Sequence, residues 1–192
     1  MGRFDRIKKP DIHLAPKHMK LKSLTFALLI MTSQFAQAQV SQADIVKEWE
    51  RSKAYTKEYL DAMPEASYVL RPTKEMRSFA EQMLHLADAN YGLASLAMGV
   101  KSPSAPGELE KSSDKTKANV VKIVMTSYDF VIENAGRMSP VQLAEKVKLF
   151  GRFEMNKEIA LWKVLEHQAH HRGQTTVYLR LAEVTPPQEK LF

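Results

Sequence analysis

The chain contains no cysteine among its 192 residues. This absence excludes disulfide bonds, zinc sites built on thiolate ligands and a cysteine nucleophile. It also excludes a lipoprotein that is anchored through a cysteine at the start of its mature chain. A metal site in this protein must therefore use other ligands.

Several further patterns are lacking. From residue 41 onward, apolar and polar residues do not alternate as they would in half-buried strands, so we expect an all-α fold. No glycine-rich phosphate loop and no Ser-His-Asp order is evident, and there are no internal repeats or low-complexity runs. If the protein is an enzyme, a metal ion would have to carry the chemistry.

An excess of basic residues is confined to the N-terminal part. The whole chain has 28 Lys and Arg and 22 Asp and Glu, of which seven and two lie in residues 1–38. The remaining 21 basic and 20 acidic residues give residues 39–192 a formal net charge of +1. This balance, without a basic stripe, argues against a nucleic-acid partner.

The N-terminal part has the three features of a secretory signal peptide. A basic start at residues 19–22 precedes a short apolar run at 24–31, and the small residues Ala36 and Ala38 follow. We expect cleavage after Ala38, export to the periplasm or the medium, and no stable membrane insertion afterwards, since the run is too short to span a bilayer. Residues 1–18 are then an upstream extension, and the true start is Met1 or Met19. The alternative is a basic amphipathic helix on an intracellular protein.

Residues 39–192 have a length that suits one domain with a single core. Apolar residues recur there at three- and four-residue steps, and four stretches are predicted as helices, at 41–63, 78–98, 114–135 and 154–183. The stretch 145–154 is expected to be irregular. Four amphipathic helices predict an antiparallel four-helix bundle.

The fourth predicted helix carries a cluster of histidines. On a helix, His167 and His171 lie one above the other, separated by ~6 Å along the axis. Two imidazoles so placed can bind one ion, and His85, on the second predicted helix, is available as a third ligand. His170 lies on another side of the helix. The alternative interpretation is that these histidines are solvated, or that one of them is buried with a satisfied hydrogen bond.

Two segments resemble the motifs of the DinB/YfiT-like superfamily. Residues 78–88, SFAEQMLHLAD, are similar to its first-histidine motif, and residues 167–174, HQAHHRGQ, are similar to its second. The resemblance covers most of residues 41–192. It implies a four-helix bundle, often a homodimer, that holds a divalent metal on three histidines, and these correspond to His85, His167 and His171.

Members of this superfamily with assigned chemistry are transferases and isomerases that use low-molecular-weight thiols. In them, the metal would lower the pKa of a bound thiol or water and generate a nucleophile near neutral pH. The predicted leader is at odds with that role, because it sends this chain out of the cytoplasm, where such thiols are made. Zinc or nickel would suit neutral imidazoles.

Two functions follow from the sequence. The first is a metal-dependent hydrolase or thiol-type transferase acting on a small molecule, with Glu81, Glu166 and Gln174 as candidates for catalytic or pocket residues. The second is a non-catalytic exported protein that binds a metal or a small ligand. An open pocket with a carboxylate near the metal favours the enzyme, and a sealed apolar shell favours the binding protein.

Overall fold

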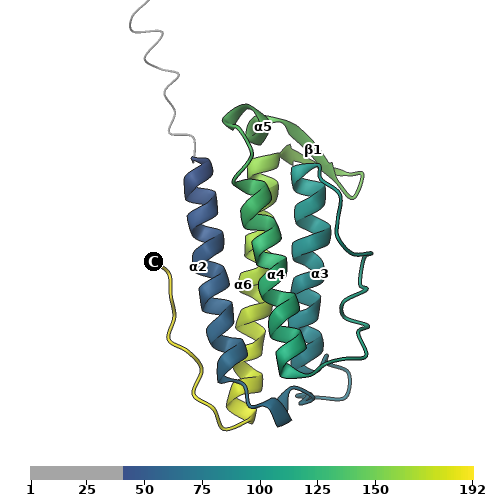
Figure 1. Ribbon diagram of the computed structural model, residues 1–192, viewed down its shortest axis with the longest axis vertical. Coiled ribbons are helices and arrows are strands. Elements are labelled where there is room, and N and C mark those ends of the chain that lie inside the picture. The colour runs from purple at the N-terminus through teal and green to yellow at the C-terminus, as the bar shows by residue number, and fades with distance from the viewer. Residues whose placement is uncertain (1–40) are drawn as a thin grey trace, which may run out of the picture. The chain divides into compact units, whose positions relative to one another are not determined.

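A computed structural model describes residues 41–192, and the predicted leader at 1–38 lies outside this part. Four long helices run side by side (Figure 1). They are α2 (Gln42–Ala62), α3 (Phe79–Met98), α4 (Lys117–Ala135) and α6 (Lys157–Leu181). The prediction of an all-α four-helix bundle is confirmed.

Short elements complete the described chain. A 3₁₀ turn, η1 (Glu65–Ser67), follows α2, and a short helix, α5 (Pro140–Ala144), follows α4. Two strands, β1 (Lys146–Leu149) and β2 (Phe153–Asn156), precede α6. Together α5 and the strands cover one end of the bundle (Figure 1).

Helix α3 begins where its capping residues predict. The Ser78 side chain accepts a hydrogen bond from the backbone N–H of Glu81, and the Glu81 carboxylate accepts one from the backbone N–H of Ser78. These reciprocal bonds satisfy two backbone donors that the helix itself leaves unpaired. The helix ends at Gly99, whose φ of 75° lies in the left-handed region that glycine adopts without steric cost. These bonds fix the start of the helix that carries His85.

Helix α4 begins three residues later than predicted, at Lys117 instead of 114. The reason lies in the Asp114 side chain, which accepts hydrogen bonds from both the backbone N–H and the hydroxyl of Thr116. Such local bonds from an aspartate hold the backbone in a turn and compete with the helix.

The expectation of an irregular stretch at 145–154 is wrong, because β1 and β2 form an antiparallel hairpin. Lys146 pairs with Asn156, and Leu149 pairs with Phe153. The turn needs positive φ values at Phe150 and Gly151, 52° and 69°. Since each strand has four residues, its alternation is too short to stand out in the sequence. The same pairing delays the start of α6 from 154 to 157.

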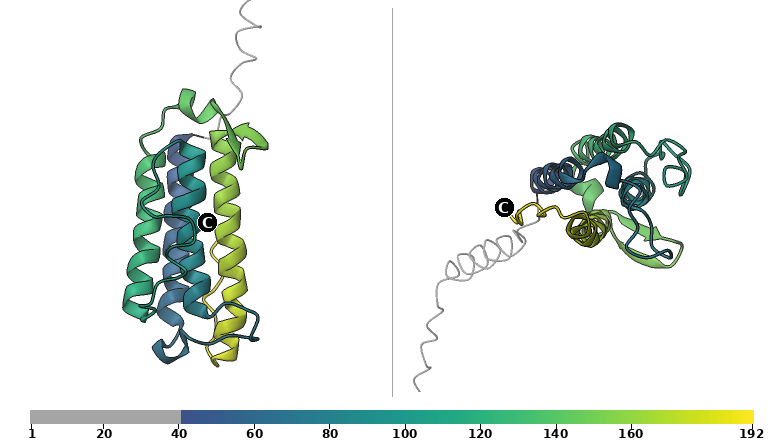
Figure 2. Two further views of the ribbon diagram at one scale, coloured as in Figure 1. Left: turned by 90° about the vertical axis from the view of Figure 1, so that its right-hand side faces the viewer. Right: turned by 90° about the horizontal axis from the view of Figure 1, so that it is seen from below.

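The connection from α3 to α4 crosses the full length of the bundle (Figure 1). Lys117, at the start of α4, donates to the backbone oxygens of Asp61 and Met63 at the end of α2. Helix α4 therefore starts at the same end as α3, and these two neighbours run parallel. Seen end-on, α2 and α3 lie diagonally opposite one another (Figure 2). The bundle thus has antiparallel pairs, α3 with α6 and α2 with α4, together with parallel pairs.

Aromatic rings and hydroxyls link the helices in the core. Trp49 and Tyr128 are fully buried and meet edge to face, with ring centroids 5.8 Å apart. The Tyr128 hydroxyl lies 2.8 Å from Oγ1 of Thr56, which satisfies a group that burial would otherwise penalise. Within residues 41–192, no helix is long and apolar enough to cross a membrane.

Candidate metal centre

The three predicted histidines converge between α3 and α6. His85 lies in the second turn of α3, while His167 and His171 lie one turn apart on α6. The ring centroid of His85 is 5.5 Å from that of His167 and 4.6 Å from that of His171, and the α6 pair is 4.2 Å apart. One nitrogen from each ring lies within 4.8 Å of the other two.

This spacing suits a single divalent ion. Bonds of about 2.0–2.1 Å to zinc place two ligand nitrogens at most about 4.2 Å apart, so a small rotation of the rings closes the difference. Nδ1 of His167 is buried and has no hydrogen-bond partner among the described residues. A buried nitrogen without such a partner, on a ring whose centroid lies 5.5 and 4.2 Å from those of two other imidazoles, fits a site for a cation.

His170 lies outside this cluster. Its side chain is exposed, and its nearest polar partner is the amide of Gln174, 3.1 Å from its Nε2. The His170 ring stands at 87° to the ring of His171. The three-residue step between His167 and His170 therefore does not bring this fourth histidine into the cluster.

Burial keeps two of the imidazoles neutral. Loss of water contact is the main cause that lowers the pKa of His167 and of His171 from 6.5 to about 4. The charge of His85 is the next cause at His167, and the charge of His167 is the next at His171. A neutral imidazole is the form that binds a metal, so both rings offer a lone pair at neutral pH.

A carboxylate that sequence reasoning missed holds His85. Oε2 of Glu110 lies 3.1 Å from Nδ1 of His85, and Oε1 accepts a hydrogen bond from Arg77 at 2.6 Å. Burial raises the pKa of Glu110, but the hydrogen bond and charge of Arg77, with a smaller effect of His85, outweigh it and lower that pKa. An ionised Glu110 accepts the Nδ1 proton of His85 and leaves the other ring nitrogen free.

Glu110 belongs to the long connection between α3 and α4, which the sequence identifies only as a loop. Asp88, one turn beyond His85, fixes this loop by accepting hydrogen bonds from the backbone N–H groups of Leu109 and Glu110, at 3.2 and 2.9 Å. One turn of α3 thus supplies both His85 and Asp88. Asp88 fixes the loop that carries Glu110, and Glu110 orients His85. In the sequence, the position of Asp88 one turn after His85 is the one hint of this arrangement. It does not identify Glu110, which is 22 residues away from Asp88.

An amide contacts His171. Nε2 of Gln82 lies 2.7 Å from Nδ1 of His171, and the same amide contacts Gln174. An amide can accept through Oε1 or donate through Nε2, so its orientation selects which ring nitrogen carries the proton. As placed, Nε2 of Gln82 faces Nδ1 of His171 and donates to it. With Oε1 turned to the ring instead, His171 would donate from Nδ1 and keep Nε2 free as a ligand. Of the three predicted pocket residues, Gln174 alone lies close to the cluster.

The other two candidates, Glu81 and Glu166, are engaged elsewhere. The Glu81 carboxylate caps α3 and forms ion pairs with Arg71 at 2.6 Å and Lys115 at 3.1 Å. Burial raises its pKa, but the Ser78 N–H and these two cations outweigh burial and lower it to about 2. A carboxylate so strongly held in its ionised form is a poor base. Glu166 is exposed and pairs with Lys163 at 2.7 Å.

A polar pocket opens beside the histidines. It has a volume of about 500 Å³, and Gln82 and Glu110, which contact His171 and His85, form part of its wall. The remaining lining residues are Glu75, Met76, Arg77, Gln174 and Tyr178. An open, polar cavity bounded by a carboxylate differs from the sealed apolar shell expected of a purely structural metal site.

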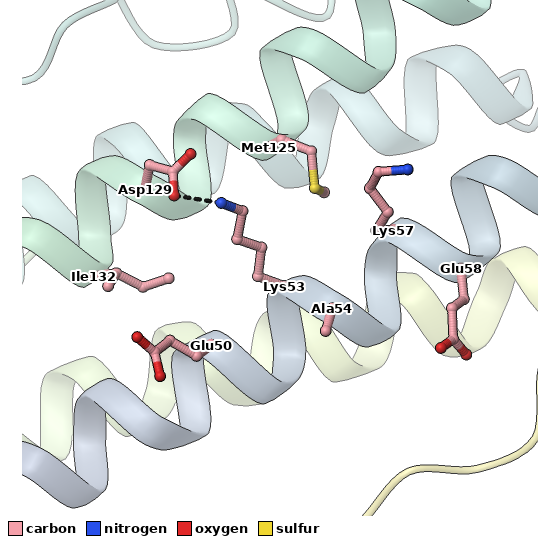
Figure 3. A pocket seen from close by; sticks show the side chains of 8 residues that line it. All are labelled: Glu50, Lys53, Ala54, Lys57, Glu58, Met125, Asp129 and Ile132. Atoms are coloured by element: carbon pink, nitrogen blue, oxygen red, sulfur yellow. Dashed lines mark hydrogen bonds and ion pairs between the residues drawn. The ribbon is translucent and has the colours of Figure 1, made fainter.

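A second pocket, between α2 and α4, lies apart from the histidines (Figure 3). Both of its lysines already have partners, since Lys53 pairs with Asp129 across it and Lys57 pairs with Asp61. Neither pocket is lined by a histidine, but Gln82 and Glu110 of the polar pocket contact His171 and His85. Among the described residues, none that lines this second pocket forms a hydrogen bond with the three histidines. This pocket is not a candidate for the site.

The orienting role of Glu110 predicts a loss of metal affinity in the variant Glu110→Gln. Removing a carboxylate partner of a metal-binding histidine typically weakens binding by about 10–100-fold, and we expect a loss in this range. Glu108→Gln, an exposed position in the same loop, is the matched control and should bind as the wild type does. Competition with a chromogenic zinc chelator measures both. Equal affinities of the two variants would exclude this role.

The lowered histidine pKa values predict a pH-dependent stability of the metal-free protein. Between pH 6.5 and about 4, the unfolded chain protonates His167 and His171 while the folded chain does not. The unfolded state binds more protons there, so the free energy of unfolding should fall as the pH falls through this window.

Urea denaturation of the chelator-treated protein between pH 6.5 and 5, above the carboxylate range, measures this effect. The double variant His167→Gln/His171→Gln should show a flatter dependence on pH. A wild-type stability that stays constant over this interval would contradict the proposed burial of the two rings in neutral form.

Comparison with known proteins identifies the family. The family model described as the DinB family matches residues 33–191, and no curated protein matches the sequence. Among solved structures, a DinB-like protein of Bacillus cereus is 20% identical with a TM-score of 0.68, over 77% of this chain and 97% of its own.

Two Bacillus subtilis structures are also similar, each over 77% of this chain. The DinB-like protein YjoA is 18% identical over 95% of its own length, with a TM-score of 0.59. YfiT is 15% identical over 92% of its own length, with a TM-score of 0.58, and is described as a probable metal-dependent hydrolase with an unusual four-helix bundle topology. At these identities the likeness concerns the fold. With the family model matching most of the sequence, the chain belongs to the DinB family.

Proposed function

We propose that the protein is a metal-dependent enzyme that holds one divalent ion on His85, His167 and His171. The observation that carries this proposal is the convergence of three imidazole nitrogens within 4.8 Å, with Glu110 on the far side of one ring. A carboxylate behind a ligating histidine is a recurrent feature of protein metal sites. The description of YfiT as a probable metal-dependent hydrolase agrees with it.

The side chains around the cluster have distinct tasks in this proposal. Three protein ligands leave a coordination position open, and the ion would then supply Lewis-acid activation of a small nucleophile. Glu110 keeps a proton on Nδ1 of His85, and Gln82 does the same at His171 when its oxygen faces the ring. Both rings then present Nε2. Zinc or nickel fits a set of neutral nitrogen ligands.

The substrate in this proposal is a small polar molecule bound in the adjoining pocket. A volume of about 500 Å³ suits a small molecule, and the lining amides of Gln82 and Gln174 can donate or accept hydrogen bonds. The Tyr178 hydroxyl donates to the backbone oxygen of Arg77 at 2.8 Å, which fixes the wall of this pocket. Hydrolysis or transfer to a small acceptor is the reaction class that this arrangement supports best.

Single substitutions test the metal assignment. His85→Ala, His167→Ala and His171→Ala should each lose metal, since losing a ligand costs at least the roughly 10–100-fold that losing a partner of a ligand costs. His170→Ala, on the same helix, should retain it and serves as the control. Elemental analysis after dialysis gives the metal content. Full metal content in a ligand variant would show that the triad is wrong.

Turnover is tested separately. The metal-loaded protein, the chelator-treated protein and His171→Ala are compared on panels of esters, amides, lactones and thiol acceptors. We expect turnover in the metal-loaded protein alone. A protein that binds metal through the triad but turns over no substrate would instead be the non-catalytic binding protein.

Export is a further part of this proposal, supported by the basic start, apolar run and small residues between 19 and 38. We expect the mature protein to begin at Gln39. Intact-mass spectrometry of protein isolated from its native host measures the N-terminus. A mass that includes residues 19–38 would exclude cleavage at Ala38.

A further inference from the structure

A buried arginine without an acidic partner lies next to the histidine cluster in the sequence but on the other side of α6. Arg172 is 8% exposed. It faces α2, where Nη1 donates to Oγ of Ser52 at 3.0 Å, and its Cζ lies 4.4 Å from the ring centroid of Tyr55. Within residues 41–192, no carboxylate forms an ion pair with it.

This arrangement leaves a positive charge uncompensated. Removing a cation from water costs several kcal/mol unless an anion or enough acceptors replace the water. A guanidinium group has five N–H donors, and among the described residues only those on Nη1 have hydrogen-bond acceptors, the hydroxyls of Ser52 and Thr56. The donors on Nε and Nη2 are available to a ligand.

Arg172 forms part of a pocket that such a ligand could enter. The pocket has a volume of about 390 Å³, within the range of about 300–1,000 Å³ that is usual for small-molecule sites. Hydroxyl donors line it beside Arg172, since the Tyr59 hydroxyl lies 3.4 Å from that of Tyr55 and 3.1 Å from that of Thr176. The C-terminal tail, at Glu189–Leu191, forms its outer wall.

A glycine in the wall of this pocket leaves room for a larger side chain. Gly173 lines it, and a Cβ atom added at Gly173 would meet no atom within 4 Å. The other cations around the pocket already have partners, because Arg51 pairs with Glu48 at 2.7 Å and Lys190 pairs with Glu58. Within residues 41–192, Arg172 is therefore the cation lining this pocket that has no ion-pair partner, and Glu189, which also lines the pocket, forms no ion pair with it.

We propose that this pocket is a second binding site, which takes a small molecule through a carboxylate or phosphoryl group. The free edge of the Arg172 guanidinium would bind two oxygens of that group side by side, which is the geometry that arginine prefers for such anions. The hydroxyls of Tyr55, Tyr59 and Thr176 add donors. Because Arg172 faces α2 while His171 faces α3, the site is distinct from the histidine cluster and does not depend on the proposed metal.

The probes are inorganic phosphate and acetate, titrated into the metal-loaded full chain at constant ionic strength, with chloride as the reference anion. Backbone amide chemical shifts report where each anion binds. We expect saturable shifts centred on residues 172–176 of α6 and 52–59 of α2. Tighter binding of phosphate identifies a phosphoryl ligand, and tighter binding of acetate identifies a carboxylate.

Two variants remove the site in different ways. Arg172→Gln removes the charge, and Gly173→Leu fills the pocket while it leaves the arginine in place and improves helix propensity. Each should weaken the binding of the preferred anion by at least about tenfold, as expected when a hydrogen-bonded charge partner is lost. Arg180→Gln, exposed on the last turn of the same helix, is the control and should bind as the wild type does.

Gly173→Leu keeps the test decisive if Arg172→Gln fails to fold. Shifts that do not saturate, or that saturate equally in the wild type and in Gly173→Leu, would overturn the proposal. Saturable shifts confined to residues around His85 and His171 would also overturn it, because the anion would then be a ligand of the histidine cluster.

Discussion

The antiparallel packing of α3 against α6 is the contact on which the candidate site depends. It sets His85, near the start of α3, opposite His167 and His171, near the middle of α6. The crossover from α3 to α4 then returns along the outside of this pair and brings Glu110 to His85. A bundle whose α3 and α4 were joined by a short turn would have no loop at this position. The parallel course of α3 and α4 is thus coupled to the surroundings of the histidines.

Helix α6 carries the histidine cluster on one face and the buried Arg172 on another. Consecutive residues of an α-helix point about 100° apart, so the adjacent His171 and Arg172 are directed to different neighbours. His171 faces α3 and contacts Gln82, which lines the polar pocket, whereas Arg172 faces α2 and stacks on Tyr55. The short motif of residues 167–174 therefore contributes to two separate cavities. In both places, a polar group has no partner among residues 41–192. These groups are Nδ1 of His167 on one side and part of the Arg172 guanidinium on the other.

The sequence was informative where a pattern is local. Helical periodicity located the four helices, and helix spacing singled out His167 and His171. The sequence was not sufficient where contacts between distant segments decide the structure. Glu110 is unremarkable in a loop until Asp88 fixes that loop beside His85. Glu81 lies one turn before His85 in the sequence, but Arg71 and Lys115 hold its carboxylate away from any role as a base. Four-residue strands such as β1 gave too short a pattern to detect.

The central claim is that the three imidazoles share one ion, and X-ray absorption spectroscopy of the zinc-loaded protein tests it most directly. This account predicts a first shell containing three imidazole nitrogens at about 2.0–2.1 Å, with one further light atom, and the multiple-scattering signature of histidine. His170→Ala should leave that spectrum unchanged. A first shell of oxygens alone, or one that contains a single imidazole, would contradict the account.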